Sequence, residues 1–296
     1  MKMPVSHSTL LRRWLPLLLL LTVAAAKGQH AFKYNLQQPN IHRQLPPMLN
    51  EVSGLTDVDD SRVACVQDEQ GIVFIYDFRT DDIISRHAFD STGDFEGLTL
   101  AGNTLYILRS DGRLTEWQHF RSANPVVKHY TLLLQTANNE GLCYDAGHDR
   151  LLIAAKSKPA APDARTLRLI YAFDLEKKQL SEEPLYRLNT DQLAADAKSF
   201  SLQLTDTTAR GMVKPFNFRP ASLSVHPLSD EIYMISAADK ILLTMNRKGE
   251  VTYMTSLPPH LFTKAEGITF LPDGTMIITN EAAGKTPGLF VFEMLP

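Results

Sequence analysis

The stretch Glu96-Gly-Leu-Thr99 opens a short apolar run, and Ala101-Gly-Asn103 supplies turn residues before a second run, Thr104-Leu-Tyr-Ile-Leu108. Short runs rich in strand-forming residues and separated by Gly and Asn are typical of antiparallel hairpins. Residues 96–108 therefore predict two neighbouring strands joined by a tight turn.

The same pattern recurs five times at a spacing of about 44 residues, which in a β-rich chain indicates propeller blades. The recurring segments are Ser53-Gly-Leu-Thr56, Glu96-Gly-Leu-Thr99, Glu140-Gly-Leu-Cys143, Ala221-Ser-Leu-Ser224 and Glu266-Gly-Ile-Thr269. A third and usually a fourth apolar run follow in each unit, as at 72–77 and 83–89 in the first. Helical periodicity over long stretches is missing after the N-terminus. We therefore expect an all-β fold, a five-bladed β-propeller, with six blades as the alternative.

Two irregularities refine this prediction. The gap between the third and fourth segments is nearly double, and residues 189–218 read as an insertion, with a helix over 191–198. Six blades would result if that insertion held strands. The last unit ends at 289–293, one strand short, so we expect the stretch 31–49 to supply its outer strand. Such closure removes an open sheet edge.

Residues 1–26 have the pattern of a secretory signal peptide. Lys2, Arg12 and Arg13 precede an apolar run that ends at Ala24-x-Ala26, and no acid interrupts it. The run is shorter than the roughly 20 residues that span a bilayer, which argues against an uncleaved anchor. No cysteine lies near the cleavage site, so a lipid anchor is not expected there. The prediction is a single domain over 27–296 in the periplasm or outside the cell, with no transmembrane span.

Composition narrows the class of protein further. A hydrophobic content of 44% with 21% charged residues excludes both a disordered chain and a polytopic membrane protein. The net charge of -3 shows no excess of basic residues of the kind that binds nucleic acid. Cys65 and Cys143, the only cysteines, lie in apolar runs and read as buried thiols, although an oxidising compartment would allow them to pair. We expect a monomer.

Acidic residues recur where each unit begins. In a propeller the first strand of a blade lines the central channel, so the residue before the small residue of each repeat should approach the axis. Glutamate occupies that position in three repeats, and further acids lie just upstream or at the ends of second strands. The candidate metal ligands are Glu96, Glu140, Glu266, Glu51, Asp68 and Glu281. Converging carboxylates repel one another unless a proton or a cation intervenes, and oxygen ligands favour calcium. The alternative is a structural role, in which they bind neighbouring backbone amides.

Other polar residues at the same strand ends are expected to face the channel as ligand contacts. These are Lys156, Asn280, Ser110 and Ser236. For Lys156 we expect compensation of the acidic charge, with binding of an anionic ligand as the alternative. His226 and His148 fall in predicted turns and read as solvated.

The chain resembles the SdiA-regulated family in motifs that follow one another in order. They include Asn50-Glu-Val-Ser-Gly-Leu55, Asp94-Phe-Glu-Gly-Leu98, Asn139-Glu-Gly-Leu142, Leu151-Leu-Ile-Ala-Ala-Lys156 and Glu266-Gly-Ile-x-Phe270. The resemblance implies a five-bladed propeller, distantly related to NHL-repeat proteins, with a calcium site and no known reaction. One departure is Ser222, where the family has glycine before its His-Pro.

Three functions remain open on this reading. The first is an exported calcium-binding module for a small ligand or a protein partner. The second is a calcium-dependent hydrolase, of lactonase or phosphoesterase type, acting in the channel. The third is a structural or adhesive module. No nucleophile-elbow, zinc-protease or phosphate-loop motif occurs, so the sequence does not decide whether the chain is an enzyme.

Overall fold

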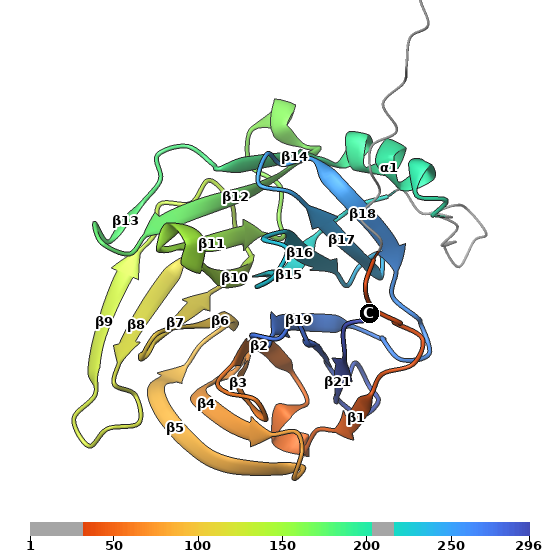
Figure 1. The fold of residues 1–296 in the computed structure, drawn as a ribbon. Helices are drawn as coiled ribbons and strands as arrows, with labels where there is room; N and C mark the ends of the chain where they lie inside the picture. The colour runs from red at the N-terminus through yellow and green to blue at the C-terminus, as the bar shows by residue number, and fades with distance from the viewer. Residues whose placement is uncertain (1–31, 203–215) are drawn as a thin grey trace, which may run out of the picture.

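The computed structural model describes residues 32–202 and 216–296. Its strands form five antiparallel sheets arranged around a central axis, as Figure 1 shows. This is the predicted five-bladed β-propeller. Each sheet has the order inner, second, third and outer strand, so blades 1 to 5 begin at β2, β6, β10, β15 and β19.

The five repeated segments form the strands nearest the axis. These inner strands are β2 (Val52–Asp57), β6 (Phe95–Ala101), β10 (Asn139–Asp145), β15 (Pro220–Val225) and β19 (Ala265–Phe270). The second strands are β3 (Arg62–Gln67), β7 (Thr104–Arg109), β11 (Arg150–Ala155), β16 (Ile232–Ser236) and β20 (Met276–Asn280). Each inner strand contacts the inner strands of both neighbouring blades, which closes the ring.

The remaining strands widen each blade away from the axis. The third strands are β4 (Gln70–Asp77), β8 (Arg113–Gln118), β12 (Leu167–Asp174), β17 (Ile241–Met245) and β21 (Gly288–Phe292). The outer strands are β5 (Asp82–Thr92), β9 (Val126–Thr131), the pair β13 (Gln179–Leu180) and β14 (Tyr186–Asn189), β18 (Val251–Ser256) and β1 (Ile41–Gln44). Three short 3-10 turns, η1 (Pro47–Leu49), η2 (Ala146–His148) and η3 (Pro162–Ala164), lie in connections.

The hydrophobic core lies between blades rather than within one sheet. Between blades 1 and 2, for example, Val66 of β3 belongs to the same buried cluster as Leu98 of β6 and Trp117 of β8. Because both faces of a blade pack against neighbouring blades, the second and third strands are almost continuously apolar. Burying one large apolar side chain in this way contributes about 1.5–3 kcal/mol.

The N-terminal stretch completes the last blade, as predicted. Strand β1 pairs antiparallel with β21, with Ile41 opposite Val291 and Gln44 opposite Gly288, and it becomes the outer strand of the sheet β1-β21-β20-β19. Leu45 and Leu49 follow it into the core. The first and last parts of the folded domain are therefore held in one sheet.

The long gap between repeats contains a helix and no extra blade in its described part. Helix α1 (Thr190–Ser199) agrees with the prediction over 191–198, and Asn189 caps it by accepting hydrogen bonds from two amides of its first turn. The outer strand of blade 3 is divided into β13 and β14, which pair with different parts of β12. Residues 203–215 of the predicted insertion lie outside the described residues, as does the predicted signal peptide.

Both cysteines are buried free thiols, as the apolar context predicted. Burial raises the pKa of Cys65 to about 12, so this thiol stays protonated. In the described part of the chain, no helix has the length and apolarity needed to cross a membrane.

Candidate functional site

A β-bulge at the start of every inner strand displaces one residue from the ladder. The pairing with the second strand shifts between Phe95 and Gly97, and the same shift occurs in the other four blades. The displaced residues are Ser53, Glu96, Glu140, Ala221 and Glu266. A bulge changes the direction in which the displaced side chain points, so the repeated bulge brings three glutamates to one end of the axis.

The glycine after the bulge is required by the next blade. A Cβ on Gly97 would lie 2.6 Å from the Leu142 Cβ, and one on Gly141 would lie 2.6 Å from Leu223. Ser222 replaces this glycine in blade 4 and is accommodated there. Its Oγ accepts a hydrogen bond from the Ile268 amide at 3.2 Å, which ties blade 4 to blade 5.

Two lysines join two of the displaced glutamates, Glu140 and Glu266, and the nearby Glu281 in a chain of ion pairs. Lys156 Nζ lies 2.6 Å from Glu140 Oε2 and 3.8 Å from Glu266 Oε1. Lys264 Nζ lies 3.3 Å from the same oxygen of Glu266 and also pairs with Glu281. Lys156 therefore compensates the acidic charge, as predicted. Lys264, the second compensating cation, was missed, although it stands two residues before Glu266 in the sequence.

Glu96 has no such partner within the described residues. Burial, with repulsion from Glu140 and Asp94, raises the pKa of Glu96 to about 8, against an ordinary value of 4.5. Burial also raises the pKa of Glu140 to about 7, although Lys156 acts in the opposite direction. The carboxyl group of Glu96 is therefore largely protonated at neutral pH.

A second crowded pair lies beside this chain. The carboxyl of Asp68 lies within hydrogen-bonding reach of Glu51, and burial together with Glu51 raises its pKa to about 7. Asp68 Oδ1 is buried and has no hydrogen-bond partner among the described residues. We use the term acidic end for the group formed by Glu51, Asp68, Glu96, Glu140, Glu266 and Glu281 with Lys156 and Lys264.

The other predicted channel residues make contacts within the protein. Asn280 is buried, and its amide group accepts from the Lys264 backbone and donates to the Glu281 carbonyl. Ser110 donates its hydroxyl to Asp94. Ser236 is fully buried and bridges the Arg219 amide and Asp239. Asn280 and Ser110 thereby fix segments next to the acidic end, whereas Ser236 fixes a loop of blade 4 that holds none of its residues.

The residues of the acidic end fit a divalent cation at one place better than at another. Between Glu140 and Glu266 the Lys156 ammonium group already supplies the positive charge, so a cation does not fit there in this arrangement. The Glu51–Asp68 pair fits better, because Asp68 Oδ1 lacks a partner and calcium accepts carboxylates together with carbonyls and water. Across residues 32–202 and 216–296, no three acidic, histidine or cysteine side chains converge as a complete metal site.

The opposite end of the axis carries mainly hydroxyl groups, together with the carboxylate of Asp57, which accepts from the Thr269 hydroxyl at 3.0 Å. The threonine that ends three of the repeated segments bonds the next blade. Thr56 Oγ1 accepts from the Leu100 amide at 3.2 Å, Thr99 Oγ1 from the Tyr144 amide at 3.0 Å, and Thr269 Oγ1 from the Asp57 amide at 3.2 Å. These residues line a small cavity of about 160 Å³. The recurrence of Thr, Cys or Ser at this repeat position is the sequence pattern from which these hydrogen bonds between blades could have been predicted.

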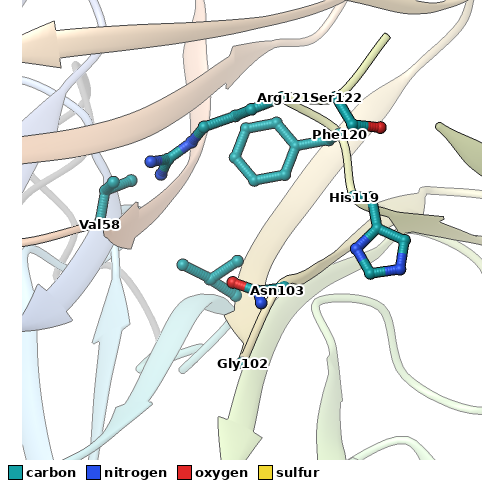
Figure 2. A pocket seen from close by; sticks show the side chains of 8 residues that line it. Val58, Gly102, Asn103, His119, Phe120, Arg121 and Ser122 are labelled. Atoms are coloured by element: carbon teal, nitrogen blue, oxygen red, sulfur yellow. The ribbon is translucent and has the colours of Figure 1, made fainter. Parts of the chain in front are cut away.

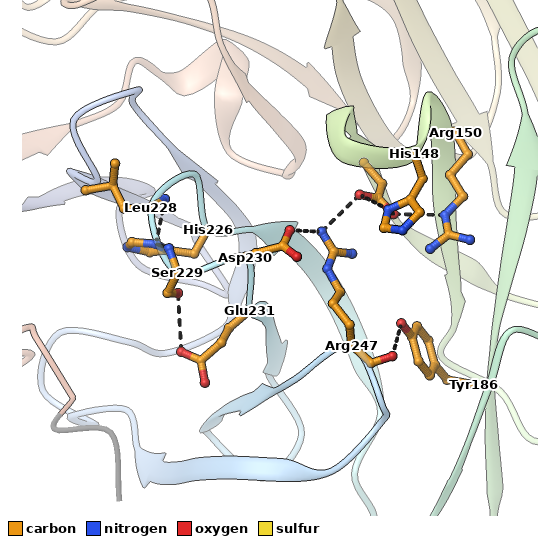
Figure 3. Close-up of polar contacts among 10 residues, drawn as sticks. His148, Arg150, Tyr186, His226, Leu228, Ser229, Asp230, Glu231 and Arg247 are labelled. Atoms are coloured by element: carbon orange, nitrogen blue, oxygen red, sulfur yellow. Dashed lines mark hydrogen bonds and ion pairs between the residues drawn. The ribbon is translucent and has the colours of Figure 1, made fainter. Parts of the chain in front are cut away.

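His226 corrects the prediction of a solvated turn. It is buried, and its Nδ1 accepts hydrogen bonds from the Leu228 and Ser229 amides at 3.2 and 3.0 Å. Burial lowers the pKa of His226, so the ring is neutral. Figure 3 shows His226 with Leu228 and Ser229 of the same turn.

Figure 3 also shows a polar cluster between blades 3 and 4 that sequence reasoning missed. Asp145 is fully buried, and its carboxylate binds Arg150 Nε at 2.8 Å and Arg247 Nη2 at 2.9 Å. Arg247 also binds Asp230. Asp145 and Arg247 lie 102 residues apart, so no local pattern could pair them.

Comparison with solved structures agrees with this architecture. A glutaminyl cyclase of Myxococcus xanthus superposes with a TM-score of 0.52 at 14% identity, covering 87% of this chain and 95% of that one. A luciferin-regenerating enzyme has a TM-score of 0.52 at 8% identity, covering 86% and 95%. At such identities the likeness concerns the fold alone. No curated protein matches the sequence.

The sequence itself matches one family description. The model of the SdiA-regulated family aligns with residues 26–203, which hold blades 1 to 3 and helix α1 and make up more than half of the chain. The match agrees with the motifs around Glu51, Glu96 and Glu140. This propeller is a member of the SdiA-regulated family.

Proposed function

We propose that the chain is an exported ligand-binding propeller whose acidic end binds a divalent cation, with calcium as the candidate. The observation that carries the proposal is the Glu51–Asp68 pair: two carboxyl groups within hydrogen-bonding reach, one with a buried oxygen that lacks a partner among the described residues. A cation there would replace the proton that the pair otherwise needs.

The surrounding charges support this location over the centre of the ring. Glu140 and Glu266 are compensated by Lys156, and Glu281 by Lys264. Within the described residues, Glu51, Asp68 and Glu96 are the members of the acidic end that no ammonium group pairs with, and of these Glu51 and Asp68 lie within reach of each other. A bound cation there would face the open side of the loops that follow the second strands.

Calorimetric titration with calcium tests the proposal. We expect the wild-type chain to bind calcium and Asp68→Asn to lose most of that affinity, because the substitution removes the ligand charge. Asp60→Asn is the matched control, since Asp60 is exposed and lies in the turn at the other end of blade 1. Equal affinity in all three proteins, or no heat at millimolar calcium, would overturn the proposal.

A hydrolase acting at the same end is the second candidate. The favouring observation is that Glu96 and Glu140 have pKa values of about 8 and about 7, which suit a general acid near neutral pH. Lactones and phosphoesters are the substrates to test, by turnover of a chromogenic panel. Activity that Glu96→Gln and Glu140→Gln abolish would favour this function, and activity that persists in both would exclude it.

The site of action is part of the proposal. The signal-peptide pattern of residues 1–26 supports export to the periplasm or beyond. Fractionation of cells, with N-terminal sequencing of the exported protein, tests it. A mature chain that begins near Lys27 is the expected result, and a protein retaining Met1 in the cytoplasm would contradict it.

A further inference from the structure

The clefts between neighbouring blades repeat around the ring, so one cleft can be compared with another in the same molecule. Between blades 3 and 4, the end of inner strand β10 places Asp145 against Arg247, which lies in the turn between β17 and β18. Asp230, from the turn between β15 and β16, binds the same guanidinium group. Figure 3 shows this arginine held between two carboxylates.

The equivalent cleft between blades 1 and 2 lacks both carboxylates. Gly54 of blade 1 and Gly141 of blade 3 hold the same position in their strand pairs, opposite Val66 and Ala154. Four residues after this glycine, blade 1 has Val58 where blade 3 has Asp145. The backbone agrees, because the Val58 amide donates to the Arg62 carbonyl at 2.9 Å. The turn that carries Asp230 in blade 4 is shortened in blade 2 to residues 102–103, which are Gly and Asn.

The basic side chains of this cleft are nevertheless present. The turn between β8 and β9 places His119 at the register position of Arg247, and Arg121 follows two residues later. The guanidinium carbon of Arg121 lies 4.9 Å from the centroid of the Phe120 ring. Arg121 makes no hydrogen bond or ion pair with any residue of the described ranges. Figure 2 shows its guanidinium group reaching over the pocket toward Val58.

A cavity of about 430 Å³ occupies the position of the missing carboxylates. Its walls combine apolar groups with polar ones at the edge; the lining includes Val58, Leu100, Phe120, Asn103 and Ser122. Its volume falls within the range of small-molecule sites, roughly 300–1,000 Å³. An apolar wall with a few polar groups and one unpaired cation is the composition of such a site.

The backbone around the cavity holds an unusual conformation. His119 has φ 52° and Gly102 has φ 58°, both in the left-handed region. A Cβ on Gly102 would meet nothing within 4 Å, so it is the φ angle, and not the space, that favours glycine there. Such conformations cost about 1–3 kcal/mol for a non-glycine residue, and they cluster at binding sites.

We propose that the cleft between blades 1 and 2 binds a small organic carboxylate with an apolar body. Its carboxylate would pair with Arg121, as Asp145 pairs with Arg247 in the equivalent cleft, and its apolar part would lie against Val58, Leu100 and Phe120. Guanidinium groups bind carboxylates through two parallel hydrogen bonds, which fixes the orientation of the ligand. A free organic acid and a peptide C-terminus share this chemistry.

The test uses fluorescence of Trp117, whose ring centroid lies 5.7 Å from that of Phe120 in the pocket wall. Trp117 is the one tryptophan of residues 27–296, the mature chain expected after removal of the signal peptide. Hexanoate is the free-acid probe, an N-acetylated dipeptide ending in leucine is the peptide probe, and hexanamide is the neutral analogue. We expect at least one acid to bind and hexanamide to bind about tenfold more weakly or not at all.

Two substitutions separate the site from the rest of the protein. Arg121→Gln should weaken binding of the acid about tenfold, whereas Arg165→Gln, at an exposed arginine of blade 3, should leave it unchanged. Val58→Asp restores the missing carboxylate and should block the probe while raising the melting temperature. Failure of both acids to bind, or equal binding by Arg121→Gln and wild type, would overturn the proposal.

Discussion

The phenolic oxygen of Tyr34 lies 2.7 Å from Nε2 of His226, although the two residues are 192 positions apart. The same hydroxyl donates to the Gly274 carbonyl at 2.5 Å. Because His226 Nδ1 accepts from two backbone amides, its proton resides on Nε2 and is donated to Tyr34. One side chain of the N-terminal stretch thereby joins the turns of blades 4 and 5.

Removing that hydroxyl should destabilise the whole propeller. Tyr34→Phe leaves the Gly274 carbonyl and the Nε2–H group of the buried His226 each without this partner, and we expect a loss of about 1–3 kcal/mol in the free energy of unfolding. Tyr253→Phe is the control, because Tyr253 stacks on Phe32 and makes no hydrogen bond through its hydroxyl within the described residues. Urea unfolding of both variants provides the measurement. Equal midpoints would show that the Tyr34 bond contributes nothing.

Removal of the N-terminal stretch should have a larger effect. A chain without residues 27–45 loses β1 and exposes the edge of β21, and it also loses the buried side chains of Tyr34, Leu36 and Leu45. We expect a lower melting temperature and a tendency to associate through the open edge. Differential scanning calorimetry with light scattering measures both. An unchanged melting curve would contradict the role assigned to β1.

The prediction of the fold from the sequence succeeded where the information was local. The repeat around Glu96, Glu140 and Glu266 placed the inner strands, because turn residues and alternating apolar runs recur there at a fixed spacing. The deficit of one strand at 289–293 identified the N-terminal partner. The division of the outer strand of blade 3 into β13 and β14 was not predicted.

The contacts of the site were harder to foresee. The positions of Glu140, Glu266 and Lys156 followed from the repeat, because a bulge at one repeat position presents equivalent side chains. The pairing of Asp145 with Arg247 and of Tyr34 with His226 depends on which blades become neighbours in space. Neither contact has a signature in the residues around it, and His226 was therefore wrongly read as solvated.

Loss of Lys156 should destabilise the fold most strongly in alkaline solution. Lys156→Met leaves Glu140 without its ammonium partner and leaves Glu266 with Lys264 alone, so the pKa values of both carboxyl groups rise further and their ionised forms become costly. We expect a loss of about 2 kcal/mol or more at pH 8, and a smaller loss at pH 6, which lies below the pKa of about 7 of Glu140. Chemical denaturation at the two pH values measures it. The double variant Lys156→Met/Glu140→Gln should recover part of the loss, and a double variant less stable than the single one would contradict the pairing.

Glu96 should make stability depend on pH in a defined direction. Its folded pKa of about 8 exceeds its ordinary value of 4.5, so the folded state binds a proton more tightly than the unfolded state. This stability is fully present below pH 4.5 and is lost as the pH rises through 8, at about 1.4 kcal/mol for each unit of pKa difference. Glu96→Gln should flatten the profile between pH 5 and pH 9, and Glu182→Gln, at an exposed position, should not. A profile that keeps its slope in Glu96→Gln would contradict the assignment.

The binding of a cation at Glu51 and Asp68 is the central claim, and proton release on calcium binding tests it most directly. Asp68 has a pKa of about 7, so calcium should displace a proton from the pair at neutral pH. Calorimetric titration at pH 7 in two buffers of different ionisation enthalpy measures that release. We expect the binding heats to differ between buffers for the wild-type chain, with the difference and the affinity both lost in Asp68→Asn. Calcium binding that is equal in Asp68→Asn, or no binding by the wild-type chain, would contradict the account.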